Sequence, residues 1–118
     1  MSKKTVIYYS DPKGQSLVWD YIRSLPSDEQ KKCFKYISYL EQIGEEIRRP
    51  FGDYLGQKLY ELRPKQTRII YFFFFKNYAI LLHAFRKKTN AIPERDIQLA
   101  WQRMNDFIVR HKKGEIQL

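Results

Sequence analysis

The sequence contains one cysteine and two histidines, and this scarcity limits the chemistry that it can support. A single cysteine, Cys33, excludes an internal disulfide and any metal site built from several thiolates. The histidines, His83 and His111, are far apart, and no pair of carboxylates has the spacing of metal ligands. We therefore expect no metal and no other cofactor. Cys33 lies in a segment with a helical pattern, and we expect it to fill space in the core of a cytoplasmic protein.

Long hydrophobic runs are missing as well. The most apolar segment, residues 69–85, is interrupted by Lys76 and Asn77, whereas a membrane-spanning helix needs about 20 continuous apolar residues. We therefore expect no membrane-embedded part. The chain of 118 residues has no low-complexity tract and no internal repeat, and its length is typical of one domain. We expect residues 1–118 to form a single domain.

Acidic residues are few relative to basic ones, and almost all of the imbalance lies in the second half of the chain. The sequence has 22 Lys and Arg against 13 Asp and Glu, which gives a formal net charge of +9. Residues 1–56 contain nine basic and eight acidic residues, whereas residues 57–118 contain thirteen and five, a net charge of +8. Such a concentration of charge favours a polyanionic partner, although a basic surface can also serve only to keep a protein in solution.

Hydrophobic periodicity divides the chain into strands and helices. Alternating or continuous apolar runs predict strands at residues 5–10, 58–63, 68–75 and 78–86. Apolar residues at helical spacing predict helices over residues 17–25, 27–44 and 93–113, and residues 48–57 are expected to form a loop. Ser27 and Gln30 match a capping box at the start of the second helix. The order β-α-α-β-β-β-α predicts an α+β fold, in which an antiparallel sheet packs against a helical hairpin and a C-terminal helix follows.

Basic residues stand at the ends of three of the predicted strands. Arg63 ends one strand and Arg68 begins the next, so a short hairpin connection brings them close together. Arg86, Lys87 and Lys88 leave the following strand at the end that lies beside the start of the Arg68 strand. We therefore expect these cations to converge at one end of the sheet. Such a cluster can bind phosphate, and it can also stabilise the additional negative charge of a phosphorane when the 2′-hydroxyl of RNA attacks its own backbone.

Two further side chains of this region have more than one interpretation. Strand alternation places His83 on one face with Ala79, Leu81 and Phe85, and a histidine on such an apolar face is more often a hydrogen-bonded core residue than a general acid or base. Glu61 shares a face with Arg63. It is equally compatible with a general base and with an ordinary ion-pair partner.

The segments "LYELR", "TRIIYFFF" and "ILLHAFRKKTNAIPERDIQLAWQRMNDF" together resemble a known family. The resemblance is to the phage-derived Gp49-like, HigB-type branch of the RelE/ParE toxin superfamily, and it is strongest over residues 57–107. It implies a RelE-like fold and the toxin half of a type II toxin–antitoxin pair. It further implies a ribosome-dependent mRNA endoribonuclease (an mRNA interferase) that needs no metal. The implied partners are a helix-turn-helix antitoxin and mRNA on the ribosome, with no small-molecule ligand.

The resemblance also implies roles for individual residues. Arg63, Arg68, Lys87 and Lys88 match positions at which cations hold the scissile phosphate and stabilise the transition state, and His83 is expected to support them. Basic residues around them are expected to bind RNA, namely Lys58, Lys65, Arg86 and Arg95. The last residues of the chain offer no clear counterpart of the tyrosine or histidines that other members use there, so the general acid is unassigned.

Two other functions are compatible with the same pattern. A ParE-like toxin with this fold inhibits DNA gyrase without cutting nucleic acid, and a basic module can bind RNA without catalysis. The basic surface can also serve only the antitoxin. The endoribonuclease hypothesis requires that Arg63, Arg68, Lys87 and Lys88 surround a common anion pocket, rather than lie on opposite sides of the protein or form internal ion pairs.

Overall fold

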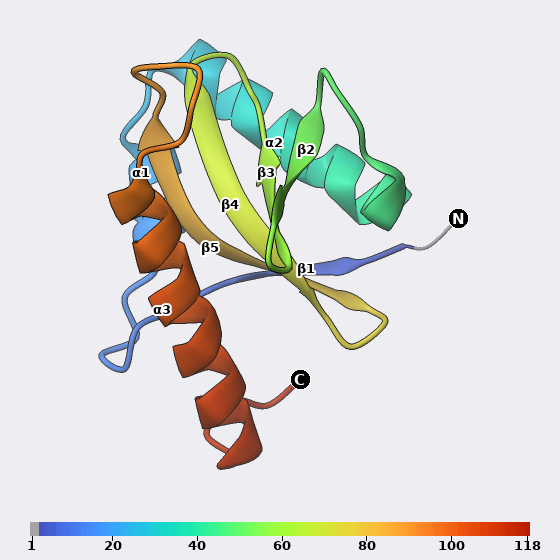
Figure 1. Cartoon of the computed structure of the whole chain (residues 1–118), viewed down its shortest axis with the longest axis vertical. Coiled ribbons are helices and arrows are strands. Elements are labelled where there is room, and N and C mark those ends of the chain that lie inside the picture. Colours follow the sequence, from blue (N-terminus) through green and yellow to red (C-terminus); the bar gives the residue numbers. More distant parts are fainter. Residues whose placement is uncertain (1–2) are drawn as a thin grey trace.

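The computed structural model describes residues 3–118 and shows a five-stranded mixed sheet between two helical layers (Figure 1). Its elements in chain order are β1 (Thr5–Tyr8), α1 (Leu17–Arg23), α2 (Ser27–Ile43), the 3-10 turn η1 (Gly44–Glu46), β2 (Gly52–Gly56), β3 (Leu59–Leu62), β4 (Thr67–Phe74), β5 (Tyr78–Arg86) and α3 (Glu94–Lys112). The strand order is β1-β5-β4-β3-β2. Across residues 3–118, every helix is too short or too polar to span a bilayer.

The predicted α+β fold is confirmed, and two details of the sheet differ from the prediction. β1 pairs in parallel with β5, whereas the other neighbouring strands are antiparallel. Residues 52–56, which were expected to lie in a loop, form the edge strand β2. The pairing depends on Gly52, because a Cβ atom there would lie 2.6 Å from the carbonyl oxygen of Glu61. A glycine is therefore needed for the close approach of β2 to β3, and this same glycine made the segment resemble a loop.

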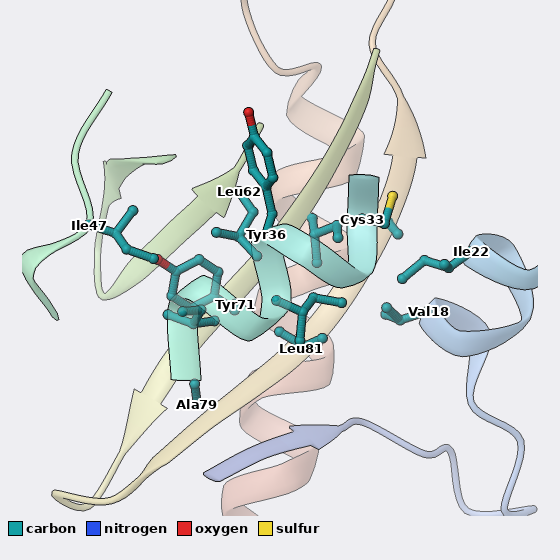
Figure 2. Close-up of a cluster of buried hydrophobic side chains, with 13 residues drawn as sticks. Val18, Ile22, Cys33, Tyr36, Ile47, Leu62, Tyr71, Ala79 and Leu81 are labelled. Carbon is teal, nitrogen blue, oxygen red and sulfur yellow. The ribbon is translucent and has the colours of Figure 1, made fainter. Parts of the chain in front are cut away.

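The sheet is covered on both faces, which explains why β4 and β5 are apolar on both sides. Figure 1 shows α3 on one side of the sheet and α1 and α2 on the other. We call these two sides the α3 face and the α2 face. In Figure 2, α2 lies across the sheet, with Tyr71 and Leu81 between the helix and the strands. On the α3 face, Ala100, Met104 and Phe107 of the helix form a second cluster with Ile70 and Leu82 of the sheet.

The helical hairpin is held together by a contact that differs from the predicted capping box. The N-cap residue of α2 is Pro26, and no side chain caps the helix. Instead, the side-chain amide of Gln30 donates hydrogen bonds to the carbonyl oxygens of Leu25 and Arg23, at 2.7 and 3.2 Å. Gln30 therefore links α2 back to the end of α1. The predicted end of α2 at Gly44 is confirmed.

A β-bulge in β5 determines which residues face α3. Tyr71 of β4 pairs with Leu81, whereas the preceding Ile70 pairs with His83, so Leu82 is an extra residue in β5. The bulge reverses the alternation beyond it, and His83 therefore contacts α3 through Asp96. The prediction that His83 shares a face with Leu81 is wrong for this reason.

Candidate functional site

The β3–β4 hairpin brings Arg63 and Arg68 together. Glu61 pairs with Ile70 and the next residue with Ile69, so continuing this register by one position sets Arg63 opposite Arg68. Lys87 follows β5, and its backbone N–H donates to the carbonyl oxygen of Gln66 at 2.6 Å. Arg63, Arg68, Lys87 and Lys88 therefore belong to one end of the sheet, and we call them the strand-end cations.

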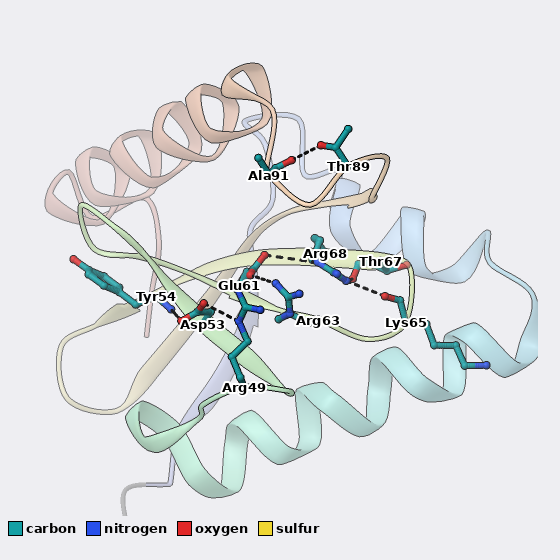
Figure 3. A network of polar contacts seen from close by, with 10 residues as sticks. All are labelled: Arg49, Asp53, Tyr54, Glu61, Arg63, Lys65, Thr67, Arg68, Thr89 and Ala91. Carbon is teal, nitrogen blue, oxygen red and sulfur yellow. Dashed lines mark hydrogen bonds and ion pairs between the residues drawn. The ribbon is translucent and has the colours of Figure 1, made fainter.

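Glu61 lies between the two arginines (Figure 3). Its Oε2 atom is 2.6 Å from Nη1 of Arg63, and its Oε1 atom is 3.8 Å from Nε of Arg68. The Glu61 side chain is 4% exposed, compared with 7% for Arg68 and 19% for Arg63. Because two guanidinium groups this close repel each other, the carboxylate lowers the energy of their juxtaposition. Of the two interpretations of Glu61, the geometry shows the ion-pair partner.

Arg68 is also bonded to the backbone of the hairpin loop. Its Nη1 atom donates to the carbonyl oxygens of Lys65 and Thr67, both at 2.9 Å. Burial lowers the pKa of Arg68, and the nearby charge of Arg63 lowers it further, while Glu61 opposes both effects. A guanidinium nevertheless stays protonated at neutral pH. Arg68 is therefore a fixed positive charge that holds the loop in place.

The strand-end cations meet the requirement for a common pocket only in part. They lie at one end of the sheet, but Arg63 and Arg68 both pair with Glu61 inside the protein. One carboxylate cannot neutralise two guanidinium groups, so a net positive charge remains. Lys87 is partly exposed and Lys88 is exposed, and both can contact an anion from solvent. The candidate site therefore combines a positive charge held inside the protein, at Arg63 and Arg68, with lysine side chains that reach solvent.

The four predicted RNA-binding residues, Lys58, Lys65, Arg86 and Arg95, are all exposed but do not form one group. Lys65 lies in the β3–β4 loop next to the strand-end cations, and Arg95 lies in the first turn of α3. Arg86 faces the opposite side of the sheet, where its Nη1 atom is 3.6 Å from Glu29 of α2. Lys58 lies in the turn between β2 and β3, roughly 17 Å along the strand from the cations at about 3.3 Å per residue.

His83 joins the end of β5 to α3. Its Nε2 atom is 2.7 Å from Oδ1 of Asp96, and its Nδ1 atom is 3.5 Å from Nη1 of Arg103. The neutral ring fits both partners, because Nε2–H donates to the carboxylate while Nδ1 faces the guanidinium. Burial lowers the pKa of His83 and Arg103 lowers it further, against the opposing effect of Asp96. His83 is therefore a hydrogen-bonded structural residue at neutral pH.

The partners of His83 were missed at the sequence level, although a signal for them exists. Asp96 and Arg103 are seven residues apart, which is about two helical turns, and they therefore lie on the same face of α3. The sequence did not reveal the face of the sheet on which the His83 side chain lies, because the bulge in β5 determines that face. Within the described part of the chain, no three His, Cys, Asp or Glu side chains are grouped so that they could hold a metal ion.

We expect the pKa of His83 to rise in Arg103→Gln and to fall in Asp96→Asn. The first change removes a positive charge that disfavours the imidazolium, and the second removes a carboxylate that favours it. NMR titration of the His83 ring protons measures both shifts. An unchanged His83 pKa in Arg103→Gln would contradict the geometry.

The same titration has a consequence for stability. Because the pKa of His83 in the folded protein lies below the ordinary value of 6.5, the unfolded chain binds the proton more readily. The contribution of His83 to the free energy of unfolding is therefore complete above about pH 6.5 and is lost as the pH falls towards the folded-state pKa. A His83→Gln variant is expected to lose this part of the pH dependence in urea unfolding measured between neutral and acid pH.

A second ion pair extends the basic surface from the strand-end cations towards β2. Nε of Arg49 is 2.9 Å from Oδ2 of Asp53, and both side chains are substantially exposed. The hydrogen bond from Arg49 lowers the pKa of Asp53, and Arg63 adds a smaller electrostatic effect in the same direction. Asp53 therefore remains charged, and the pair places another guanidinium close to the candidate site.

Comparison with known proteins identifies the family. The model of the family described as phage-derived protein Gp49-like matches residues 20–105, from within α1 to within α3. The matched region includes every strand-end cation together with Glu61, His83 and Asp96. The chain matches none of the curated proteins with which it was compared. Since the match covers well over half of the sequence, the protein belongs to the phage-derived Gp49-like family, which is a family of RelE/HigB-like toxins.

Proposed function

We propose that this toxin is a ribosome-dependent mRNA endoribonuclease that acts in the cytoplasm without a metal. The observation that supports the proposal is the placement of the strand-end cations at one end of the sheet, where Arg63 and Arg68 share the carboxylate of Glu61. Membership of a toxin family supports it independently. In the reaction, the 2′-hydroxyl of a nucleotide attacks the adjacent phosphorus, and the 5′-oxygen of the next nucleotide leaves. The phosphorane between these states carries more negative charge than the ground state.

In this proposal the strand-end cations have different tasks. Arg63, Lys87 and Lys88 have solvent-accessible parts, and they hold the scissile phosphate and stabilise the phosphorane. Arg68 is a positioning residue, because its guanidinium is bonded to the loop and to Glu61 inside the protein. His83 supports the site indirectly, since its bond to Asp96 fixes the end of β5 against α3 and so orients the segment that contains the two lysines.

The proposed partners follow from the family and from the charge. A toxin of a toxin–antitoxin pair has an antitoxin, which we propose to be a small helix-turn-helix protein. Acidic segments of such a protein would complement the net charge of +8 in residues 57–118. The nucleic-acid partner is mRNA bound to the ribosome.

A ParE-like inhibitor of DNA gyrase is the second candidate. The internal pairing of Arg63 and Arg68 with Glu61 favours it, because guanidinium groups engaged inside the protein are less available to a phosphate. A non-catalytic RNA-binding module is compatible with the same observation. Both alternatives predict toxicity or binding without new RNA ends.

Inducible expression with mapping of the 5′ ends of cellular messages tests the proposal. We expect cuts at codon-phased positions within translated regions, and we expect a Lys87→Ala/Lys88→Ala variant to lose them at equal protein abundance. Lys112→Ala/Lys113→Ala is the matched control, because these two exposed, adjacent lysines lie at the C-terminal end of α3, outside the candidate site, and their loss should leave the cuts unchanged. Toxicity with intact transcripts and altered DNA supercoiling would instead establish the gyrase alternative.

A further inference from the structure

An aromatic hollow of about 440 Å³ lies between α2 and the chain segment that leads into β2. It is lined by Lys35, Tyr36, Ser38, Tyr39, Gln42 and Phe51, and we call this set the aromatic hollow. Its size is within the range of small-ligand pockets, which are typically apolar with a few polar groups. The site described above does not use it.

Three aromatic rings form one wall of the hollow. The ring centroids of Tyr39 and Phe51 are 4.7 Å apart, and those of Tyr36 and Phe51 are 5.4 Å apart. Tyr36 is buried at 9% exposure, whereas Tyr39 is 37% exposed. The cluster is therefore anchored on the inside by Tyr36 and offers Tyr39 to solvent. A flat, fixed ring of this kind can stack on the face of a nucleobase.

Polar and basic side chains complete the hollow. Gln42 and Ser38 can donate and accept hydrogen bonds, as the edge of a nucleobase requires. Lys35 lines the hollow, and Nζ of Lys32 lies 5.6 Å from the centre of the Tyr36 ring. Two lysines on one helix next to an aromatic wall favour an anionic ligand that also has an aromatic part.

The hollow adjoins the strand-end cations through the backbone. The N–H group of Arg63 donates to the carbonyl oxygen of Phe51 at 2.9 Å, so the residue that closes the hollow is hydrogen-bonded to a residue of the candidate site. Arg49 lies two residues before Phe51 and adds a further exposed guanidinium. The backbones of the two sites are therefore adjacent, and this adjacency is the reason to assign both sites to one nucleic-acid strand.

We propose that the aromatic hollow binds a base of single-stranded RNA, next to the nucleotide whose phosphate is held at Arg63. The base stacks on Tyr39, its edge contacts Gln42, and Lys35 contacts the adjoining phosphate. The inference rests on the proposed endoribonuclease function and adds a base-recognition subsite to it. Contacts to a base edge distinguish one base from another, so the hollow contributes to the choice of the cleaved sequence.

Fluorescence anisotropy with short 2′-O-methyl RNA oligomers tests the subsite without cleavage, since these oligomers lack the attacking hydroxyl. We expect Tyr39→Ala to weaken binding roughly 5- to 150-fold, the range typical of one base–aromatic stack. Tyr39→Phe keeps the ring and should bind like the unaltered protein. Tyr54→Ala is the matched control, because Tyr54 is a 55% exposed tyrosine that does not line the hollow.

An oligomer with one abasic position identifies the contact. When the base that occupies the hollow is missing, the unaltered protein should bind the oligomer more weakly, by about the same factor as Tyr39→Ala weakens the binding of the complete oligomer. Tyr39→Ala should bind the abasic and the complete oligomer equally well. Equal RNA affinities for Tyr39→Ala and Tyr54→Ala, or no RNA binding by the unaltered protein, would overturn the subsite. Unchanged RNA binding with weakened antitoxin binding in Tyr39→Ala would assign the hollow to a protein partner instead.

The RNA-binding experiment and the mapping of RNA ends in cells test the subsite and the endoribonuclease separately. If base-dependent binding at Tyr39 is observed while expression in cells produces no new RNA ends, the endoribonuclease is refuted and the RNA subsite stands. If cuts occur in cells and Tyr39→Ala changes neither RNA affinity nor the cut positions, the subsite is refuted and the endoribonuclease stands.

Discussion

Arg63→Ala is expected to slow the cleavage of ribosome-bound message by about 100- to 1000-fold. Arg63 is the strand-end arginine whose side chain reaches solvent, whereas the guanidinium of Arg68 is bonded to the hairpin loop. A donor aimed at the developing charge acts mainly on the transition state, so the loss should appear in the rate constant at saturating ribosome complex rather than in binding. The measurement is single-turnover cleavage with purified ribosomes and a defined message.

Two variants separate charge from position in this experiment. Arg86→Ala removes an exposed arginine that pairs with Glu29 on the opposite face of the sheet, so it should keep the unaltered rate constant at saturating ribosome complex, whatever its effect on RNA binding. Arg63→Lys retains the positive charge but lacks the planar fork of donors. Its cleavage rate should lie between those of Arg63→Ala and Arg86→Ala. Thermal unfolding of each variant confirms that the folded fraction is the same. Equal cleavage rates for Arg63→Ala and Arg86→Ala would show that Arg63 does not act in the reaction.

Glu61→Gln is expected to lower the free energy of unfolding by about 3 kcal/mol. The change removes the only carboxylate within reach of Arg63 and Arg68 among the ion pairs of residues 3–118. Arg63 can turn towards solvent, but Arg68 is 5% exposed and remains as a buried charge without a counter-ion. Urea unfolding followed by tryptophan fluorescence measures the loss.

Asp53→Asn provides the matched control for Glu61→Gln. Asp53 also pairs with an arginine, but that pair is exposed, and such pairs typically contribute at most about 1 kcal/mol. A double variant, Glu61→Leu/Arg68→Met, should be more stable than Glu61→Gln, because it leaves no buried charge. A loss in Glu61→Gln as small as that in Asp53→Asn would mean that the Glu61 pairing contributes little to the fold.

Strand periodicity was sufficient to predict the end of the sheet at which the basic residues gather. Consecutive short connections make β3, β4 and β5 antiparallel, so residues at alternate strand ends must lie together. The helices were equally predictable from the sequence, because the apolar residues that pack against the sheet recur at helical spacing. The edge strand β2 was not predicted, since two of its five residues are glycines, whose usual role is in turns.

Side-chain partners within the site were harder to predict than strand positions. Glu61 and Arg63 stand two residues apart on one strand, which left the ion pair and the general base equally compatible with the sequence. The environment of His83 depends on a β-bulge, and no residue type in β5 indicates that bulge. The partners of His83 come from α3, which is distant in the sequence. The aromatic hollow was missed because Tyr39 and Phe51 are brought together only by the fold.

The extra residue in β5 gives α3 one more contact than a regular strand could offer. Side chains of a regular strand alternate between its two faces, whereas Leu82 and His83 are adjacent in the chain and both face α3. A one-residue deletion at Leu82 would restore regular pairing and leave His83 opposite Ile70, so the lysines that follow would keep their orientation. The deletion would instead remove a fully buried side chain from the core on the α3 face. The bulge therefore allows one strand to supply both an apolar contact and the polar anchor of His83 to the same helix.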